Sequence, residues 1–269
     1  MSRALTELLQ ELQDGHLRVV DLTQLLSPQT PLLPLPSQWN NSPAFRIWEL
    51  SRYDERGPAW YWNAFETGEH TGTHFDAPVH WVSGKDLPDN SVDRVPPRKF
   101  VGPACVIDIS AEAARNPDFL LTLDGVQDWE KQHGPIPAGA WVLLRTDWSK
   151  RMDPTDYINL KENGPHTPGL AKETSAFLAT ERDVLGVGVE TVGTDAGQAA
   201  TFDPPFPNHY LMHGSGKFGW PLCPTLTSFR RPVPSLLLHH SKSSADPVVL
   251  CGSLPSHPEP PGAPPIAGG

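Results

Sequence analysis

The sequence predicts a single α/β domain with a sheet-rich core, in which a mixed sheet is surrounded by helices. Strands alternate with helices in the second half of the chain, which is typical of α/β units. The first half is rich in strand patterns, which favours antiparallel or mixed pairing there. A chain of 269 residues is long enough to bury one large core.

The first half opens with a predicted helix, because Leu5, Leu8, Leu9 and Leu12 recur at helical spacing and Gly15 then ends the pattern. Residues 17–23 (LRVVDLT) predict a strand. The mixture of Pro, Ser, Gln and Asn over residues 27–42 predicts a long loop. Aromatic and β-favouring residues then predict three further strands, over residues 45–53, 59–68 and 105–110.

The second half of the chain alternates between segments with helical periodicity and segments with the apolar pattern of buried strands. Residues 122–134 predict a helix, and residues 140–146 (AWVLLRT) a buried strand. Pro168 and Gly169 precede a predicted helix over residues 171–183. The apolar run over residues 184–191 (VLGVGVET) predicts the next strand. No internal repeat is present.

Composition excludes several classes of partner. The net charge of −10 disfavours nucleic acid and anionic membrane surfaces, which select patches of Lys and Arg. No apolar run approaches the roughly 20 residues of a membrane helix, and the N-terminus lacks a signal-peptide core. Three scattered cysteines imply no disulfide framework. We therefore expect a cytoplasmic enzyme with no nucleic-acid or membrane partner.

The stretch EHTGTHFDAPVHW places His70, His74, Asp76 and His80 within eleven residues. The spacing of His70 and His74 fits one helical face, but Gly72 and Pro78 disfavour a helix. In an extended chain, alternate residues share a face, and all four positions are even-numbered. A bent strand with loop ends would turn all four side chains toward one point.

Imidazole nitrogens with a carboxylate oxygen suit Zn²⁺, Mn²⁺ or Fe²⁺. A catalytic site often uses three protein ligands and leaves a position for water, while a fourth histidine can move a proton. The alternatives are a surface histidine–aspartate pair and a structural metal. A structural zinc site is disfavoured because such sites are usually closed by cysteines, and none is nearby in sequence.

The segment HTGTHFDAPVH matches in full the signature H-x-G-T-H-x-D-x-P-x-H, and by it the chain resembles the cyclase family of metal hydrolases, which includes bacterial kynurenine formamidases and isatin hydrolases. The resemblance extends through VVDLT, RTDWS, PGL, GVETVGTD and HYLMHGSGKFG, over residues 18–219. It implies that His70, His74 and Asp76 are metal ligands, that His80 is the catalytic acid/base, and that the chain assembles into a homo-oligomer.

The same resemblance bears on the number of metal ions. In two-zinc formamidases, a histidine and a glutamate twelve positions later help to hold a second metal. His209 matches this histidine, but Pro221 stands in place of the glutamate and cannot bind a metal. We therefore expect one Mn²⁺ or Zn²⁺ per chain, with His209 beside a second metal or supporting the first. His213 is an alternative ligand only if its segment is helical.

Other features are ambiguous. Trp60, Trp62 and Trp81 flank the cluster in sequence and could form an aromatic wall for a flat substrate or simply pack in the core. Glu190 and Asp195 could orient ligand histidines or lie in a solvated turn. Gly214, Gly216 and Gly219 form a G-x-G-x-x-G string, but Pro221 follows where a nucleotide-binding helix should begin.

The last fifty residues differ from the rest. We expect residues 1–219 to form the hydrolase domain and residues 220–269 an aberrant, Pro-rich tail. Family members end in a pattern similar to N-L-D, P-L-K-I and G-S-G-S-P. Legal codons can be chosen for this tail that yield that ending when they are read with a two-base offset. We infer a frameshift near residues 219–223 that replaces the last strands. Resequencing the gene tests this, and an intact frame would end the hypothesis.

The sequence as a whole predicts a metal-dependent hydrolase that cleaves the C–N bond of a small amide, either a linear formamide or a cyclic amide such as isatin, with an aromatic substrate weakly indicated by the tryptophans. The alternatives are a kynurenine formamidase proper, a metal-binding protein without turnover and, from the glycine string, a dinucleotide oxidoreductase.

Overall fold

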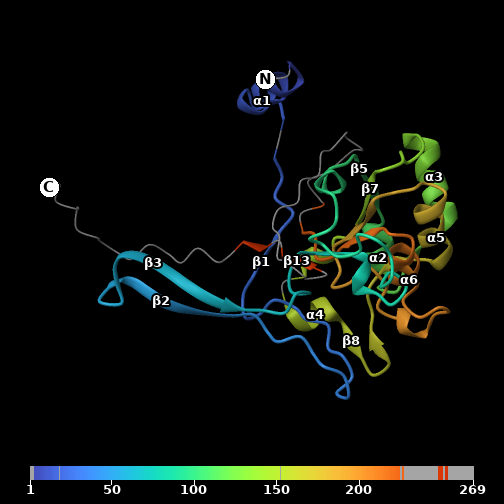
Figure 1. Ribbon diagram of the computed structural model, residues 1–269. Coiled ribbons are helices and arrows are strands. Elements are labelled where there is room, and N and C mark those ends of the chain that lie inside the picture. Colours follow the sequence, from blue (N-terminus) through green and yellow to red (C-terminus); the bar gives the residue numbers. More distant parts are fainter. Residues whose placement is uncertain are drawn as a thin grey trace.

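The computed structural model describes residues 3–17, 19–151, 153–224, 226, 248–250 and 252–253 (Figure 1). Its centre is a six-stranded mixed sheet, which confirms the predicted fold class. In spatial order the strands are β13 (Val248–Leu250), β4 (His74–Asp76), β12 (Phe218–Trp220), β11 (Gly186–Val189), β7 (Trp141–Arg145) and β5 (Ala104–Asp108). The last four run parallel, and β4 pairs antiparallel with both β12 and β13.

The parallel strands are short apolar runs. In β7, Val142 lies opposite Cys105 of β5 on one side and Val187 of β11 on the other. All residues of β7 are buried except Arg145, which is half-buried. Near-continuous burial is typical of parallel strands that are covered on both faces.

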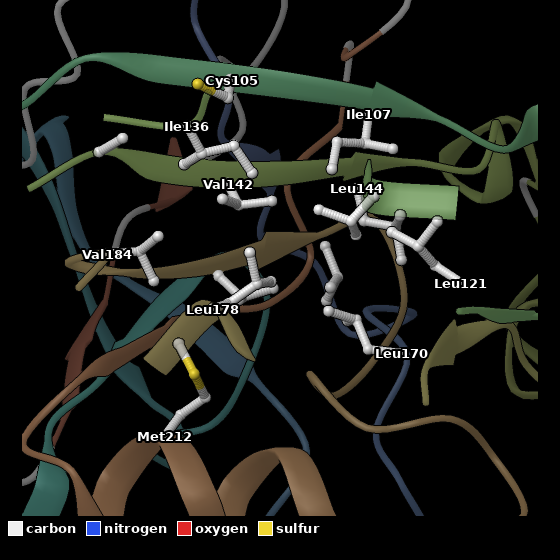
Figure 2. Close-up of a cluster of buried hydrophobic side chains, with 14 of the residues drawn as sticks. Cys105, Ile107, Leu121, Ile136, Val142, Leu144, Leu170, Leu178, Val184 and Met212 are labelled. Carbon is white, nitrogen blue, oxygen red and sulfur yellow. The ribbon is translucent and has the colours of Figure 1, made fainter. Parts of the chain in front are cut away.

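Helices that connect these strands cover one face of the sheet (Figure 2). The helices are α2 (Ser110–Arg115), α3 (Leu123–His133), α5 (Lys172–Thr180) and α6 (Pro207–Gly214). Leu178 of α5 and Met212 of α6 pack beneath the strands in the same cluster as Val142 and Leu144. Because alternate strand residues face the same way, the neighbouring positions of each strand point to the other face.

The opposite face of the sheet carries an aromatic cluster. Phe75 of β4 contacts Phe218 of β12 and Trp141 of β7, with ring centroids 4.9 Å and 6.1 Å away. Phe100 packs on the same ring at 4.8 Å. Burial of Phe75 on this face orients β4, so His74 and Asp76 on either side of it point to the face that α6 covers.

The remaining elements lie outside the central sheet. Two parallel two-stranded sheets pair β1 (Gln24–Leu25) with β14 (Gly252–Ser253) and β6 (Leu120–Leu121) with β10 (Gly169–Leu170). A short hairpin pairs β8 (Leu160–Lys161) with β9 (Gly164–Pro165). The other helices are α1 (Arg3–Gln13), α4 (Pro154–Ile158) and the 3-10 helices η1 (Pro78–His80), η2 (Pro97–Phe100), η3 (Trp148–Lys150) and η4 (Ala199–Thr201). None of the helices in the described part of the chain has the length and hydrophobicity needed to span a bilayer.

A long antiparallel hairpin reaches away from the central sheet (Figure 1). It pairs β2 (Arg46–Asp54) with β3 (Gly57–Glu66), and a bulge between Glu49 and Ser51 shifts the register. The two strands predicted over residues 45–53 and 59–68 are therefore confirmed, but they form a sheet of their own.

The strand predicted over residues 17–23 is wrong for the described residues 19–23, which form no strand. The Asp21 carboxylate accepts hydrogen bonds from the Thr23 backbone N–H at 3.0 Å and from the Thr23 hydroxyl at 2.6 Å. This local turn removes a donor that a strand would need for its ladder. The helices predicted near α1, α3 and α5 and the strands near β5, β7 and β11 are confirmed.

Most of the predicted tail, residues 220–269, lies outside the described residues. The segment that the frameshift hypothesis concerns therefore lies mostly outside them as well. Trp220 ends β12, and Leu222, Cys223 and Leu226 are buried. β13 pairs with β4 at the edge of the central sheet.

A fully buried carboxylate, Glu190, joins the ends of β7 and β11. One oxygen accepts from the backbone N–H of Thr146 at 2.7 Å and from its hydroxyl at 3.0 Å, and the other accepts from Ser149 Oγ at 3.0 Å. Burial raises the pKa of Glu190, against these hydrogen bonds. Glu190 therefore holds strand ends together, and its carboxylate makes no hydrogen bond to any of the described histidines.

Replacement of Glu190 tests this role. Glu190→Ala should lower the free energy of unfolding by about 2–4 kcal/mol, because it leaves the Thr146 N–H buried without an acceptor and opens a cavity. Glu190→Gln retains the volume and one acceptor, so it should lower the free energy of unfolding by less.

The folded-state pKa of Glu190 lies above its ordinary value of 4.5. The stability of the native chain relative to Glu190→Gln should therefore fall as the pH rises from 4.5 through the folded-state pKa. Urea unfolding between that pH and neutrality checks both effects, and a difference that is constant with pH would contradict the second.

Candidate metal centre

The predicted cluster, His70 to His80, is an extended segment that ends in a short turn. Gly72 has a φ of +67°, which a side chain rarely adopts, and it turns the chain from His70 into β4. Pro78 begins η1, whose last residue is His80. His74 and Asp76 are buried, while His70 and His80 are half-buried.

Three potential ligand atoms meet at one point. His70 Nδ1 lies 3.2 Å from His74 Nε2 and 3.1 Å from Asp76 Oδ1, and His74 Nε2 lies 3.2 Å from Asp76 Oδ1. Donors bound to one transition metal ion at about 2.0–2.2 Å lie about 2.9–3.6 Å from one another. The triangle therefore has the size that a shared divalent cation requires.

The hydrogen bonding of these residues also fits a metal ion. Asp76 Oδ1 is buried and makes no hydrogen bond to any described residue, although a buried acceptor without a partner is costly. His74 Nδ1 is 2.7 Å from the carbonyl oxygen of Gly72, so Nδ1 carries the hydrogen and Nε2 presents its lone pair. These two atoms, with His70 Nδ1, form a donor set that suits Zn²⁺ or Mn²⁺.

His80 adjoins this triangle without belonging to it. Its ring packs on His70 with centroids 4.0 Å apart. Burial holds the pKa of His80 well below its ordinary value, and the nearby Asp76 opposes that shift. A neutral ring in this position can accept a proton.

Helix α6 brings His209 and His213 to the same place, because residues four apart share one face of a helix. The ring centroids of both lie within 6 Å of His80, at 5.5 Å and 5.9 Å. Ser83 Oγ donates to the carbonyl oxygen of Tyr210 at 2.7 Å, which fixes the loop after η1 to this helix.

Asp195 anchors the start of α6. Its carboxylate accepts from the backbone N–H groups of Asn208 and His209 at 2.7 Å and 3.0 Å, which are free donors in the first turn of a helix. The same carboxylate lies 2.5 Å from His209 Nδ1. Asp195 therefore caps α6 and holds the lone pair of His209 Nε2 toward the centre, as the sequence allowed.

His209, His213 and Asp76 form a second group of ligand atoms that lie within 4.8 Å of one another. His213 Nδ1 is 3.1 Å from the carbonyl oxygen of Lys217, so its Nε2 presents a lone pair, and that atom is buried without a hydrogen bond among the described residues. His213 lies on helix α6, so the condition under which the sequence made it an alternative ligand is met. Burial lowers the pKa of His213 to about 4, and the neighbouring His209 lowers it further.

Asp76 is the anionic centre of both groups. Burial alone would raise its pKa, but electrostatic attraction to the surrounding His74, His70 and His80 holds the pKa of Asp76 well below its usual range. Gly219 of β12 pairs with Asp76, and a Cβ at Gly219 would lie only 2.9 Å from Asp76 Oδ2. The last glycine of the G-x-G-x-x-G string thus makes room for the carboxylate. The string runs from the end of α6 into a strand, the reverse of a nucleotide-binding turn.

The three predicted tryptophans have different positions. Trp81 packs on His209 with centroids 4.7 Å apart and on Phe206 at 5.5 Å, so it forms part of the wall beside His80. Trp60 and Trp62 lie on the protruding hairpin, where about half of each side chain is exposed. The prediction placed all three tryptophans near the cluster because they are close to it along the chain, and the sequence does not show their positions in space.

The chain is similar to proteins of known activity. Residues 20–196 match the family described as "Putative cyclase". The chain is 45% identical over 218 residues to isatin hydrolase from Roseibium aggregatum, covering 80% of this chain and 82% of that protein. It is 30% identical over 202 residues to kynurenine formamidase from Salinibacter ruber, covering 74% and 78%.

Solved structures agree with these matches. Isatin hydrolase A from Ralstonia solanacearum superposes with a TM-score of 0.90 at 49% identity, over 92% of this chain and 95% of that one. An isatin hydrolase bound to the product analogue thioisatinate superposes with a TM-score of 0.83 at 44% identity, over 85% and 88%.

Replacement of Asp195 tests its hold on His209. In Asp195→Asn the amide can donate to His209 Nδ1, which would move the ring hydrogen to Nε2 and remove the lone pair from the centre. We expect this tautomer change in ¹⁵N NMR spectra of the imidazole, with a loss of about 1–3 kcal/mol of unfolding free energy from the weakened helix cap. Asn208→Ala, on the same turn, keeps the backbone N–H and should leave the tautomer unchanged. An unaltered His209 tautomer in Asp195→Asn would contradict the assignment.

Proposed function

Because the chain belongs to the cyclase family of metal-dependent hydrolases and is an enzyme that cleaves amide C–N bonds, we propose that His70, His74 and Asp76 hold one divalent metal ion and that His80 is the acid/base. The observation that carries this proposal is the triangle of three ligand atoms at 3.1–3.2 Å, with a buried carboxylate oxygen that makes no hydrogen bond to the described residues.

A divalent ion at these donors would lower the pKa of a bound water and polarise the substrate carbonyl. The protein residues supply the rest. The Gly72 carbonyl holds the tautomer of His74, and Asp76 contributes the negative charge. Gly219 and Phe75 fix Asp76 in the sheet, so the ligand geometry needs little rearrangement on binding.

His80 moves the proton in this proposal. The water oxygen forms a bond to the amide carbon, and His80 takes the proton that the water loses. When the C–N bond breaks, His80 returns that proton to the leaving nitrogen. The products are a carboxylic acid, which releases its proton to solvent near neutrality, and an amine, so atoms and charges balance without any other reactant. The low pKa of His80 leaves its ring free to accept a proton near neutrality.

We propose a cyclic aromatic amide of the isatin type as the substrate. Identity is higher to isatin hydrolases, 44–49%, than to the formamidase of S. ruber, 30%. Pro221 in place of a second-metal glutamate also favours the one-metal, isatin type, and Trp81 offers a flat surface beside His80. Hydrolysis of N-formylkynurenine is the second candidate, because the same chemistry opens a linear formamide.

Mn²⁺ and Zn²⁺ both suit two imidazoles and a carboxylate. We propose one tightly held ion per chain, with His209 in a supporting position through Asp195. We also propose a cytoplasmic location and assembly into a homo-oligomer. A metal-binding protein without turnover and a dinucleotide oxidoreductase are not supported, because the similar proteins of known activity are hydrolases.

Two substitutions separate metal binding from proton transfer. His80→Ala should keep one metal per chain by elemental analysis but lose about 10²–10⁴-fold in kcat, because only the proton carrier is removed. His74→Ala should lose the metal and the activity together. Hydrolysis of isatin, other lactams, N-formylkynurenine and simple formamides is followed by absorbance, and isatin should have the highest kcat/KM.

His133→Ala is a matched control, since His133 lies on α3 and its ring contacts Trp129, away from the cluster. It should keep both metal and activity. Full activity of the native chain after complete removal of metal by a chelator, or metal loss in His80→Ala, would overturn the assignment of roles. Preference for N-formylkynurenine would select the second candidate.

A further inference from the structure

A second cluster of polar side chains, apart from the metal centre, surrounds His166. This histidine follows the β8–β9 hairpin, and most of its side chain is buried. Its Nδ1 lies 2.8 Å and 2.7 Å from the two carboxylate oxygens of Asp118, which precedes β6. Its Nε2 lies 3.0 Å from Oδ1 of Asn163, in the turn of the hairpin. Both ring nitrogens therefore face an oxygen atom.

The hydrogen atoms of this cluster can be assigned from one group that can only accept. The carbonyl oxygen of Pro165 accepts from the side-chain amide of Gln198, whose Nε2 lies 2.7 Å away. Gln198 Oε1 then faces the other way and accepts from Asn163 Nδ2 at 3.3 Å. This orientation leaves the Asn163 oxygen next to His166 Nε2. An unprotonated Nε2 would place two lone pairs 3.0 Å apart, so Nε2 carries a hydrogen.

The Asp118 carboxylate determines the other ring nitrogen. An ionised carboxylate can only accept hydrogen bonds, so His166 Nδ1 must donate to it. The ring is thus held as an imidazolium between a carboxylate and an amide oxygen, since a neutral ring would lose one of these two contacts. Gln198 Nε2 also lies 3.4 Å from His166 Nε2, but its shorter bond to Pro165 fixes its orientation.

The segment that follows His166 is in close contact with the loop that contains Asp195. A Cβ at Gly197 would lie only 2.4 Å from the carbonyl oxygen of Pro165. A Cβ at Gly169 would lie 2.5 Å from the backbone nitrogen of Ala196. The two stretches of main chain therefore touch directly beside Asp195, and the Gln198 amide joins them to the cluster.

We propose that His166, with a hydrogen on both ring nitrogens, is a positioning residue for the metal centre. It fixes the loop after Asp195 through Asn163 and Gln198. Asp195 in turn holds Nδ1 of His209. If the loop loosens, the carboxylate moves away from this nitrogen, and the ring of His209 can adopt its other tautomer, which turns a hydrogen toward the centre. This inference rests on the proposed function of that centre.

NMR of the full chain, loaded with Zn²⁺ and labelled with ¹⁵N at histidine, tests the protonation directly. Both ring nitrogens of native His166 should carry a hydrogen near neutrality. In Asp118→Asn the amide can donate to Nδ1, so a neutral ring keeps both contacts, and His166 should carry a hydrogen on Nε2 alone. A single hydrogen on native His166 would overturn the proposal.

Two variants break the cluster at different points. His166→Leu removes the ring, and Gln198→Ala removes the amide that joins it to the loop. Both should lower kcat for isatin about 10-fold with KM and metal content unchanged, and both should shift His209 toward the tautomer with a hydrogen on Nε2. Asp118→Asn should retain the native kcat and tautomer. A purely structural role would change thermal stability and leave the His209 tautomer as it is.

His16→Leu is the matched control, because His16 also pairs with a carboxylate, that of Glu11 at 3.2 Å, but on the exposed N-terminal segment. It should match the native chain in every measurement. Circular dichroism checks the fold of each variant, and Gln198→Ala alone decides if His166→Leu does not fold. The proposal is wrong if a folded cluster variant behaves like His16→Leu. If the native chain hydrolyses no amide, the proposed function fails, whereas the His166 hydrogens and the His209 tautomer still decide this inference.

Discussion

The buried carboxylate of Asp76 is the constraint on which the rest of the structure depends. A carboxylate inside a sheet is very unfavourable unless positive charge and hydrogen-bond donors compensate it. Here the sheet itself leaves space for it, because Gly219 has no side chain to crowd Asp76 Oδ2. The surrounding histidines and the cation that we assign to them supply the compensation. Removal of any of these components would leave an isolated charge in the core.

The histidines are kept ready to bind by their second nitrogen atoms. Gly72, Asp195 and Lys217 each occupy Nδ1 of one imidazole and so hold its Nε2 lone pair toward Asp76. Two of these partners are backbone carbonyls, so the tautomers are set by the path of the main chain as much as by side chains. This arrangement preorganises the centre, and it explains why a glycine turn and a helix cap matter to chemistry several ångströms away.

The two faces of the central sheet have different roles. The aromatic cluster around Phe75 holds β4 on one side, while α6 covers the other side and carries two of the histidines. The parallel strands form a rigid base, and the antiparallel pairing of β4 with β12 brings the metal-binding stretch next to Gly219. The hairpin β2–β3 lies outside this arrangement and reaches away from the central sheet.

The sequence alone determined the features that depend on neighbours along the chain. The apolar periods predicted α1, α3, α5 and the strands β5, β7 and β11, and the even spacing of His70, His74, Asp76 and His80 predicted that these residues converge. These predictions succeeded because a few adjacent residues set both the backbone conformation and the side-chain direction. The local turn made by Asp21 shows the limit of this reasoning, since one side chain replaced a strand that hydrophobicity favoured.

The resemblance to the family indicated His209 and, if helical, His213, but only the tertiary structure decided how these distant residues reach the centre. His209 and His213 follow Asp76 by more than 130 residues, and helix α6 delivers them because Asp195 and the packing of Met212 fix its position. Trp60 and Trp62 are close to His70 in sequence, yet the hairpin carries them outward. The separation of two residues along the chain sets only the greatest distance they can have in space. The pairing of strands and the packing of helices must therefore decide which side chains meet.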